Sequence, residues 1–392
     1  MELKHYDYIQ KVLDDAVNSG SVAGGTVSIL FGNDEVYKNH FGYADIENRV
    51  KPDDNTIFRL FSMTKPITAI ACLMLIERGI LDYNDCVSQY LEGFKNQTVW
   101  NWNSKQAEPL TQPVTIRDLL TMTSGLTYPA DWSETCLRTA VLFNENTKLI
   151  KQGGGMSTVE FCNRLGQIPL VCKPSQSWIY GTSADVLGAV IERVSGKSFG
   201  QYLKDEVFTP LDMNDTGFYI PEEKYSRLAQ VYYYDDQDQK LKVYDGMNLC
   251  ISDYKKPPKF ESGGAGLVST VKDYQKFIKM ILNGGIYNGN RIIGKRTIEL
   301  MRTPALKPSQ MDSLTGSNSG YNYGCLVRVL QDRQLAGTNA SLGEFGWDGW
   351  TGNYFSIDPV ENISIMYFIQ KCGAGFSDVA RKIRAITYSS LD

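Results

Sequence analysis

Histidine is the scarcest reactive residue in this sequence, because only His5 and His40 occur among 392 residues and both lie near the N-terminus. A Ser–His–Asp hydrolase, a histidine-rich zinc site or a histidine-ligated iron site would have to use one of these two. We therefore expect that an enzyme built on this chain takes its general base from another residue type. We also expect no metal and no organic cofactor.

Cysteine occurs eight times, but without a CxxC pair or any other metal-ligand spacing. A chain of this length buries roughly three-quarters of its unfolded surface, so it needs no disulfides for a stable core. Reduced thiols and a cytoplasmic location are therefore expected. The N-terminus lacks the apolar core of about 7–15 residues that a signal peptide requires. The expected location would be periplasmic or extracellular only if a leader had been removed.

Long apolar runs and an excess of one charge are also missing. No window approaches the ~18 uninterrupted apolar residues of a membrane-spanning helix. Lys and Arg number 40 against 44 Asp and Glu, for a net charge of −4. This balance argues against a nucleic-acid or anionic-membrane binder. A small-molecule partner is expected, and the oligomeric state is left open.

Three well-known ligand or nucleophile motifs fail on inspection. Ile191 stands where a phosphate loop ending at residues 196–198 requires glycine. The pattern that begins at Gly264 has Ser269 in place of the third glycine of a dinucleotide fingerprint. A nucleophile elbow at residues 181–185 fails at its last position.

Strand and helix patterns are segregated along the chain. Helical patterns fill the middle, at residues 68–78, 115–122 and 182–194, while residues 97–113 and 153–155 are typical of surface loops. Strand patterns lie near both ends, at residues 24–32, 35–38, 323–330, 353–357 and 363–369.

Two of the helices begin with apparent capping boxes, Thr115 with Asp118 and Thr182 with Asp185. An amphipathic first helix is expected to have Tyr8, Val12 and Leu13 on its apolar face.

This segregation predicts an α+β fold, in which helices flank an antiparallel sheet built from both chain ends and a mainly helical domain is inserted. We assign residues 1–60 and 240–392 to the sheet domain and residues 61–239 to the helical domain. The active site is expected at their interface.

With histidine set aside, a lysine on the same helix face can activate a serine. Residues three apart in S-x-x-K lie on one side of a helix, about 5–6 Å apart at Cβ, and the amine then reaches the hydroxyl. The pattern occurs three times, at Ser62–Lys65, Ser252–Lys255 and Ser269–Lys272. Taken alone it is a weak signal, since an N-capping serine beside a surface lysine has the same spacing.

Sequence context separates the three. Ser252–Lys255 runs into Lys256-Pro257-Pro258, which indicates a loop. Ser269–Lys272 overlaps a capping box of Thr270 with Asp273, so Lys272 is expected to be exposed. Ser62–Lys65 stands between a strand-like segment and the most hydrophobic helix of the chain, where helix-terminal amides favour a developing negative charge.

Tyr180 is the second candidate. It ends a short apolar run two residues before a helix, so its phenol can project from a loop held between rigid elements. A phenol with a pKa of ~10 serves as a base only beside a cation, and Lys65 can supply that charge. The alternative is a core tyrosine, one of 23 in the chain.

Residues 345–354 are the third candidate, because glycines alternate there with large aromatics. Such a strand permits close approach to its backbone, as an acyl oxygen bound by N–H groups requires. The alternative is aromatic packing on a sheet with glycine kinks.

Together, residues 58–66, 116–126, 180–185 and 263–270 resemble, in order and spacing, the serine β-lactamase/penicillin-binding-protein-like superfamily. The similar branch comprises class C β-lactamases, D-Ala-D-Ala carboxypeptidases and family VIII carboxylesterases. The resemblance implies the β-lactamase/transpeptidase-like fold. It also implies that Ser62 is the acylated nucleophile, Lys65 its partner, and Tyr180 the general base and proton relay. The backbone amides of Ser62 and Trp350 would form the oxyanion hole.

The chain departs from the family pattern at the positions that would contact substrate. The K-T-G or H-x-G triad is replaced by Trp347-Asp348-Gly349, no S-D-N occurs, and Thr182 stands where β-lactamases often have asparagine. Loss of the triad lysine argues against penicillins, and Trp-x-Gly is the form seen in esterase members. Trp347 and Trp350 would offer apolar walls, and Asp348 would repel carboxylates if its side chain faced into the site.

We therefore expect a serine hydrolase that cleaves a small-molecule ester or amide through an acyl-enzyme on Ser62, with carboxylic esters preferred. β-Lactamase, D-Ala-D-Ala carboxypeptidase or D-aminopeptidase action by the same residues is the nearest alternative. Acyl transfer to an acceptor other than water is another. Non-catalytic ligand binding is the alternative from a different class.

Overall fold

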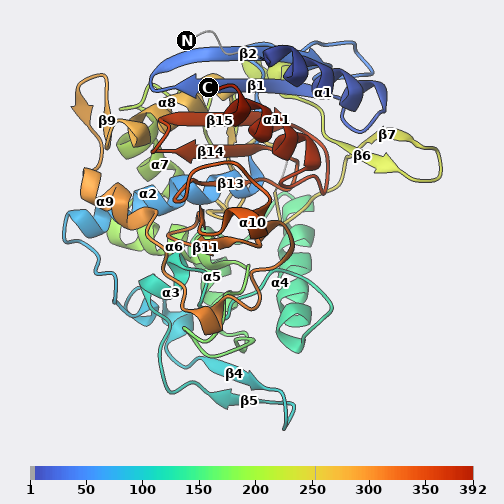
Figure 1. Cartoon of the computed structure of the whole chain (residues 1–392). Helices are drawn as coiled ribbons and strands as arrows, with labels where there is room; N and C mark the ends of the chain where they lie inside the picture. Colours follow the sequence, from blue (N-terminus) through green and yellow to red (C-terminus); the bar gives the residue numbers. More distant parts are fainter. Residues whose placement is uncertain (1–4, 252, 392) are drawn as a thin grey trace.

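A seven-stranded antiparallel sheet, built from both ends of the chain, dominates the upper part of the molecule in Figure 1. The computed structural model describes residues 5–251 and 253–391. In the sheet order β11-β12-β13-β14-β15-β1-β2, N-terminal β1 pairs with C-terminal β15, so the two ends close one sheet. This confirms the expected fold class. The strands are β1 (Gly24–Phe31), β2 (Asp34–Gly42), β11 (Tyr321–Tyr323), β12 (Arg328–Leu330), β13 (Phe345–Asp348), β14 (Tyr354–Asp358) and β15 (Ile363–Ile369).

Helices cover both faces of this sheet. The first and last helices, α1 (Tyr6–Asn18) and α11 (Asp378–Ser389), pack against each other on one face, and α8 (Val271–Leu282) packs on the other (Figure 1). Burial on two faces explains why almost every residue of β1 is buried. The apolar face of α1 differs from expectation, because Ile9, Leu13 and Ala16 are buried whereas Tyr8 is 53% exposed.

The segment between β2 and β11 is rich in helix and is organised around α2 (Thr64–Glu77). Residues 64–75 of α2 are all buried, as expected for a helix that is apolar on every side. It packs against α6 (Ser183–Ser195) and α9 (Lys295–Met301). The domain boundaries at residues 60 and 240 stay a prediction.

Three local predictions were wrong. Residues 97–113 contain a hairpin of β4 (Thr98–Asn101) and β5 (Gln106–Pro109) rather than only loop. Residues 323–330 are not one strand, because β11 ends at Tyr323, residues 324–327 connect the two strands, and β12 begins at Arg328. Leu326 in this connection has a left-handed φ of 57°, which ends regular pairing.

The third error is the capping box at Thr182, whose side chain makes no cap hydrogen bond. The capping box of Thr115 with Asp118 is confirmed.

The remaining elements are short and connect these layers. The other helices are α3 (Ile116–Leu120), α4 (Glu134–Lys151), α5 (Thr158–Gly166), α7 (Phe199–Leu203) and α10 (Arg333–Ala336), with a π-helical turn η4 (Lys204–Phe208) and 3-10 turns η1 (Phe61–Met63), η2 (Val87–Gln89), η3 (Glu92–Phe94), η5 (Glu222–Arg227), η6 (Pro308–Gln310) and η7 (Gly316–Asn318). The other strands are β3 (Phe58–Arg59), β6 (Tyr232–Asp235), β7 (Lys240–Val243), β8 (Val268–Ser269), β9 (Ile286–Tyr287) and β10 (Asn290–Arg291).

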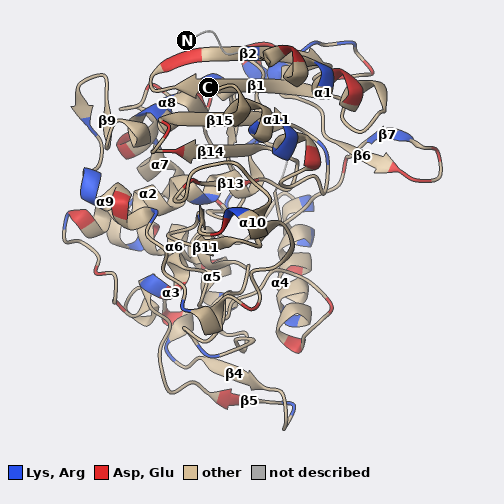
Figure 2. Cartoon of the chain, in the orientation of Figure 1, with Lys and Arg blue, Asp and Glu red and all other residues tan. Residues whose placement is uncertain are grey.

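Charge is interspersed rather than gathered, as Figure 2 shows for acidic and basic residues along the helices and loops. Within the described ranges, no helix combines the length and hydropathy needed to cross a membrane. All eight cysteines carry free thiols.

Candidate active site

Ser62 lies where the chain leaves β3 and enters α2. Phe61, directly before it, has a φ of 45°, a left-handed conformation that is strained for a phenylalanine. Met63 and Thr64 have right-handed helical angles. Ser62 and Lys65 therefore occupy one helical turn, and the spacing of three places their side chains together as the sequence predicted.

Lys65 is completely buried, and its ammonium group has a partner for each of its three N–H donors. Nζ donates to Ser62 Oγ at 3.1 Å, to Tyr128 Oη at 3.0 Å and to the Gly264 carbonyl at 2.8 Å. A buried ammonium needs such pairing because an unsatisfied charge in the interior is costly. Its position is therefore fixed by groups from three separate segments.

Tyr180 completes the set expected from the sequence. Its hydroxyl donates to Ser62 Oγ at 2.6 Å, and Lys65 Nζ lies 4.7 Å from the centroid of its ring. Trp347 Nε1 in turn donates to Tyr180 Oη at 3.4 Å. Ser62 Oγ is thus held between a phenol and an ammonium group, and Tyr180 is held by an indole.

The Gly264 carbonyl is presented to Lys65 by a loop that a buried carboxylate anchors. Asp185 Oδ1 accepts hydrogen bonds from Ser262 Oγ at 2.5 Å and from the Gly264 N–H at 3.0 Å. A Cβ at position 264 would lie 2.6 Å from Tyr128 Oη, so only glycine lets the loop approach this closely. Burial raises the pKa of Asp185, while Ser262 and Lys65 act to lower it.

Tyr128 is a site residue that sequence reasoning missed. Beyond accepting from Lys65, its ring lies 5.5 Å from that of Tyr180. Burial, and next the nearby Asp185, raise the pKa of Tyr128, which favours its neutral form. The sequence held a signal that could have identified Tyr128, because the family-like motif at residues 116–126 ends two positions before it.

Trp350, the second expected oxyanion donor, belongs to a turn that is tied to the nucleophile segment. Thr351 Oγ1 and Asn353 Nδ2 both donate to the Arg59 carbonyl, at 3.1 and 2.6 Å. The ring of Trp350 packs 5.0 Å from that of Phe61. Among the described residues, neither the Ser62 nor the Trp350 backbone N–H has a protein acceptor.

The Trp347-Asp348-Gly349 segment lies beside Tyr180, and its residues are packed or paired within the protein. Trp347 is 4% exposed, so it supports Tyr180 more than it offers an open wall. Asp348 is paired with Arg328 at 2.5 Å, so a cation offsets the charge with which it was expected to repel carboxylates. Gly349 is pressed against backbone, since a Cβ there would lie 2.4 Å from the Leu60 carbonyl oxygen.

Other candidates lie apart from this cluster. Thr182 is fully buried, so it lines no surface that a substrate reaches in this structure. His5 is the N-terminal cap of α1, and His40 on β2 is bonded to Thr26 and Asp54. Ser252 lies outside the described residues. In the described part of the chain, no three Asp, Glu, His or Cys side chains are grouped as metal ligands.

Several known proteins are similar to this chain in sequence or in fold. The beta-lactamase family model matches residues 9–387. Protein Rv1367c of Mycobacterium tuberculosis is 29% identical over 373 residues, 93% of this chain and 89% of that protein. Esterase EstB of Burkholderia gladioli is 28% identical over 389 residues, 94% and 91% of the two chains. Among solved structures, EstCE1, described as a hydrolase with promiscuous acyltransferase activity, superposes with a TM-score of 0.83, 26% identity and 97% and 98% coverage.

Proposed function

The chain belongs to the beta-lactamase family and is a serine hydrolase, and from this premise we propose that it cleaves carboxylic esters through an acyl-enzyme on Ser62. The observation that carries the proposal is the position of Ser62 Oγ, 3.1 Å from Lys65 Nζ and 2.6 Å from Tyr180 Oη. A nucleophile within hydrogen-bond reach of a base, which a third group orients, has the arrangement that covalent catalysis needs.

The proposed reactive form is the Tyr180 phenolate, which has released to solvent the proton that its hydroxyl donates to Ser62 Oγ in this structure. Ser62 Oγ then attacks the ester carbonyl carbon and passes its proton to Tyr180 Oη. The Lys65 ammonium, 4.7 Å from the Tyr180 ring, stabilises the negative charge on either oxygen while the proton moves. The backbone N–H groups of Ser62 and Trp350 bind the carbonyl oxygen as it becomes negative.

The intermediate then collapses with loss of the alcohol, which takes its proton from Tyr180. In the second half, Tyr180 accepts a proton from water as the water attacks the acyl carbon, and Ser62 Oγ then leaves and takes that proton back from Tyr180. Atoms balance as ester plus water giving acid plus alcohol. An acceptor alcohol in place of water would make the same site an acyltransferase, which is the side activity described for EstCE1.

The preference for esters over β-lactams is supported by position 347. The family triad's lysine would hold a substrate carboxylate there, whereas this chain has a buried tryptophan packed 5.6 Å from Tyr180. The name of the relative EstB agrees with this preference.

A labelling and turnover experiment tests the proposal. A serine-directed fluorophosphonate should label the folded protein, and the Ser62→Ala variant should lose both labelling and turnover. Wild type is screened side by side on p-nitrophenyl butyrate, nitrocefin and D-alanyl peptides, and the ester should be fastest. Faster nitrocefin hydrolysis would overturn the ester preference, and no labelling would favour a binding protein.

A further inference from the structure

A cavity of about 700 Å³ opens beside the nucleophile segment. Phe61, the residue before Ser62, forms part of its wall. The ring of Trp350 lies 5.0 Å from Phe61 and 5.5 Å from Tyr244, another wall residue. Two wall residues, Phe61 and Tyr244, therefore contact the ring of Trp350, and Phe61 is next to Ser62 in the chain, although Ser62 and Trp350 do not themselves line the cavity. The volume of the cavity suits a drug-sized ligand. Much of the remaining wall is apolar, with Met247, Ile251 and Phe260.

Arg59 introduces a cation into this wall. A guanidinium has five N–H donors, and in the described structure only one hydrogen bond is made, from Nη1 to the Ala229 carbonyl at 2.5 Å. None of the described carboxylates lies within ion-pair distance of it. The ring of Tyr254 faces it at 5.8 Å. Arg59 is half-buried, and its remaining donors are not among the described buried atoms that lack a partner, so they stay accessible to an anion from the cavity.

Tyr254 adds a second unused donor at the same end of the cavity. It lines the cavity, its side chain is 1% exposed, and its hydroxyl is buried without a hydrogen-bond partner. Buried hydroxyls are normally paired, so one without a partner calls for an explanation. Burial also raises the pKa of Tyr254, which keeps it protonated and able to donate.

The charges along the whole cavity lining also favour an anionic ligand. Its cationic side chains outnumber its acidic ones by four to two. Asp253, the acidic residue nearest Tyr254 in sequence, is exposed and accepts from the Lys255 N–H. The lining cations are Arg59, Lys151, Lys256 and Lys259, and the acids are Asp245 and Asp253.

We propose that Arg59, assisted by Tyr254, binds a carboxylate on the substrate, so that the preferred substrates are esters carrying a free carboxylate several carbons from the scissile bond. The apolar part of the substrate lies along Phe61, Tyr244 and Met247, and the charged end meets the guanidinium. A planar guanidinium matches a carboxylate through two parallel hydrogen bonds. This inference rests on the proposed function and names its substrate class.

Two pairs of probes distinguish a carboxylate on the acyl side from one on the alcohol side. The acyl pair is the p-nitrophenyl monoester of adipic acid and p-nitrophenyl hexanoate. The alcohol pair is 4-butanoyloxybenzoate and its methyl ester. In one pair, wild type should show a kcat/KM for the charged probe roughly tenfold or more above the neutral one, as expected for a charge-assisted bidentate contact.

Arg59→Gln should collapse that ratio to about one, because glutamine can still donate to Ala229 but carries no charge. Arg59→Lys should keep part of it. Tyr254→Phe should lower the ratio of kcat/KM for the charged probe to that for the neutral probe by a few fold. Because phenylalanine removes only the unpartnered hydroxyl, this variant also tests the proposal if Arg59→Gln does not fold. Lys272→Gln, the same charge change at an exposed helix residue, should leave the ratio unchanged.

Binding is measured separately by calorimetry with the Ser62→Ala variant and the intact charged ester. Tighter binding of the charged than of the neutral probe, lost on adding Arg59→Gln, supports the inference even if turnover is slow. Equal ratios in wild type and Arg59→Gln, or no preference in either pair, would overturn it. If instead wild type hydrolyses no ester at all, the proposed function fails, and the calorimetry still reports on Arg59.

Discussion

Two S-x-x-K segments lie side by side in this molecule and have entirely different surroundings. Strand β3, which leads to Ser62, pairs with β8, so that Phe58 is opposite Ser269. At the first segment, Lys65 is buried and donates to Ser62. At the second, Lys272 is exposed, and Ser269 Oγ is bonded to Thr216 Oγ1 at 2.8 Å.

The difference comes from where each helix begins. The 3-10 turn η1, which contains Ser62, runs directly into α2, so Ser62 and Lys65 share one turn. Helix α8 is capped by Thr270, whose side chain accepts from the Asp273 N–H, so Ser269 lies before the helix on the strand. A spacing of three brings side chains together only when both residues follow the helical path.

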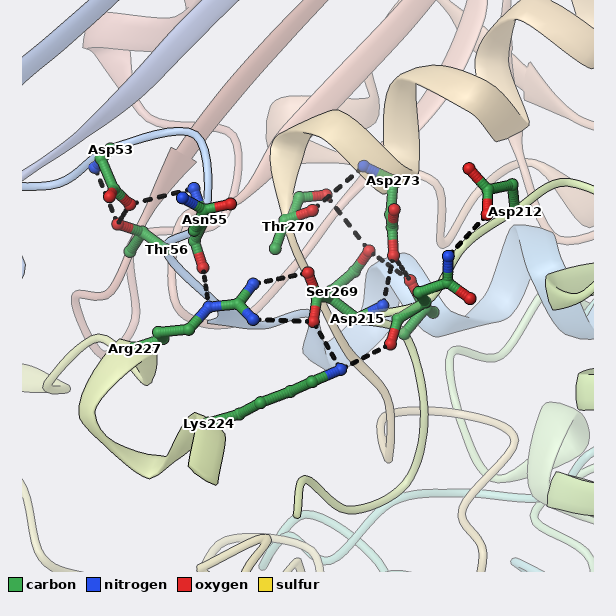
Figure 3. A network of polar contacts seen from close by, with 12 residues as sticks. Asp53, Asn55, Thr56, Asp212, Asp215, Lys224, Arg227, Ser269, Thr270 and Asp273 are labelled. Atoms are coloured by element: carbon green, nitrogen blue, oxygen red, sulfur yellow. Dashed lines mark hydrogen bonds and ion pairs between the residues drawn. The ribbon is translucent and has the colours of Figure 1, made fainter. Parts of the chain in front are cut away.

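The surroundings of Ser269 form a structural network, which Figure 3 shows. Asp273 accepts from the Asp215 N–H at 2.7 Å, and Asp215 pairs with Lys224 at 2.8 Å and with Arg227. None of these groups lines one of the cavities found in the described part of the chain. The network fixes the loop before β6 against α8, and we expect it to contribute to stability rather than to turnover.

Replacing the two serines should give the largest contrast. Ser62→Ala should lower ester kcat/KM by roughly 10³-fold or more, because the acyl-enzyme cannot form. Ser269→Ala should leave kcat/KM within about threefold and cost ~1–2 kcal/mol of unfolding free energy through the lost buried hydrogen bond. Steady-state kinetics and urea denaturation check both. Equal loss of turnover in the two variants would contradict the assignment.

The two lysines should differ almost as much. Lys65→Met should cost nearly as much turnover as Ser62→Ala, since members of one catalytic unit are not additive. Lys272→Met should change kcat/KM by less than about twofold, as expected for an exposed side chain. The double variant Ser62→Ala/Lys65→Met provides the check, and a further large loss relative to Ser62→Ala would show that the residues act independently.

Tyr128→Phe should have an intermediate effect. Lys65 would lose one of three acceptors, so its ammonium would be held less firmly, and kcat should fall roughly tenfold with KM little changed. Tyr90→Phe, which removes a part-buried hydroxyl that donates to Asp85, is the matched control with unchanged kinetics. An unchanged kcat in Tyr128→Phe would mean that Gly264 and Ser62 suffice to position Lys65.

Through the Ser269 network, pH should change the unfolding free energy of the protein but not its turnover. Burial acts to raise the pKa of Asp215, but hydrogen bonds from Arg227 and Lys224 outweigh it, so the pKa is lowered. The stabilisation is therefore present above the unfolded pKa of about 4 and is lost as pH falls through the lower folded value. Asp215→Asn should cost ~1 kcal/mol at pH 7, with a difference from wild type that shrinks below pH ~4.

Urea denaturation across this pH range measures the effect, and kcat at pH 7 serves as the control. A stability difference that grows toward low pH would show that Asp215 is not held charged by its two partners.

The smallest effect is expected at the histidines. His40 lies on β2 and is bonded to Thr26 and Asp54, apart from the groups that contact Ser62. His40→Gln should change kcat/KM by less than about twofold, measured on the same ester. A loss of tenfold or more would mean that a histidine takes part in proton handling after all.

The sequence predicted the sheet from both chain ends because hydrophobic periodicity is a local property that survives without tertiary information. It was less accurate where a single backbone angle decides the structure, as at Leu326, whose left-handed φ divides one expected strand into two. Capping residues were ambiguous for a similar reason. Thr182 and Asp185 have the spacing of a capping box, yet Asp185 bonds to Ser262 and Gly264 instead.

The sequence by itself determined which reactive side chains are available and how they are spaced. Two histidines, one S-x-x-K ahead of the most apolar helix, and a tyrosine before a second helix pointed to Ser62, Lys65 and Tyr180, because their identities and local spacing are written in the chain. The catalytic roles of these three residues remain a proposal.

Only the tertiary structure decided how these groups are held. Tyr128, the Gly264 carbonyl and Arg59 gain their parts from partners far away in sequence, such as the Asp185 that anchors Gly264 from 79 positions away. Hydrogen bonds and burial depend on distances that folding creates, so no local pattern records that Asp348 is neutralised by Arg328 or that a cation faces the cavity beside Ser62.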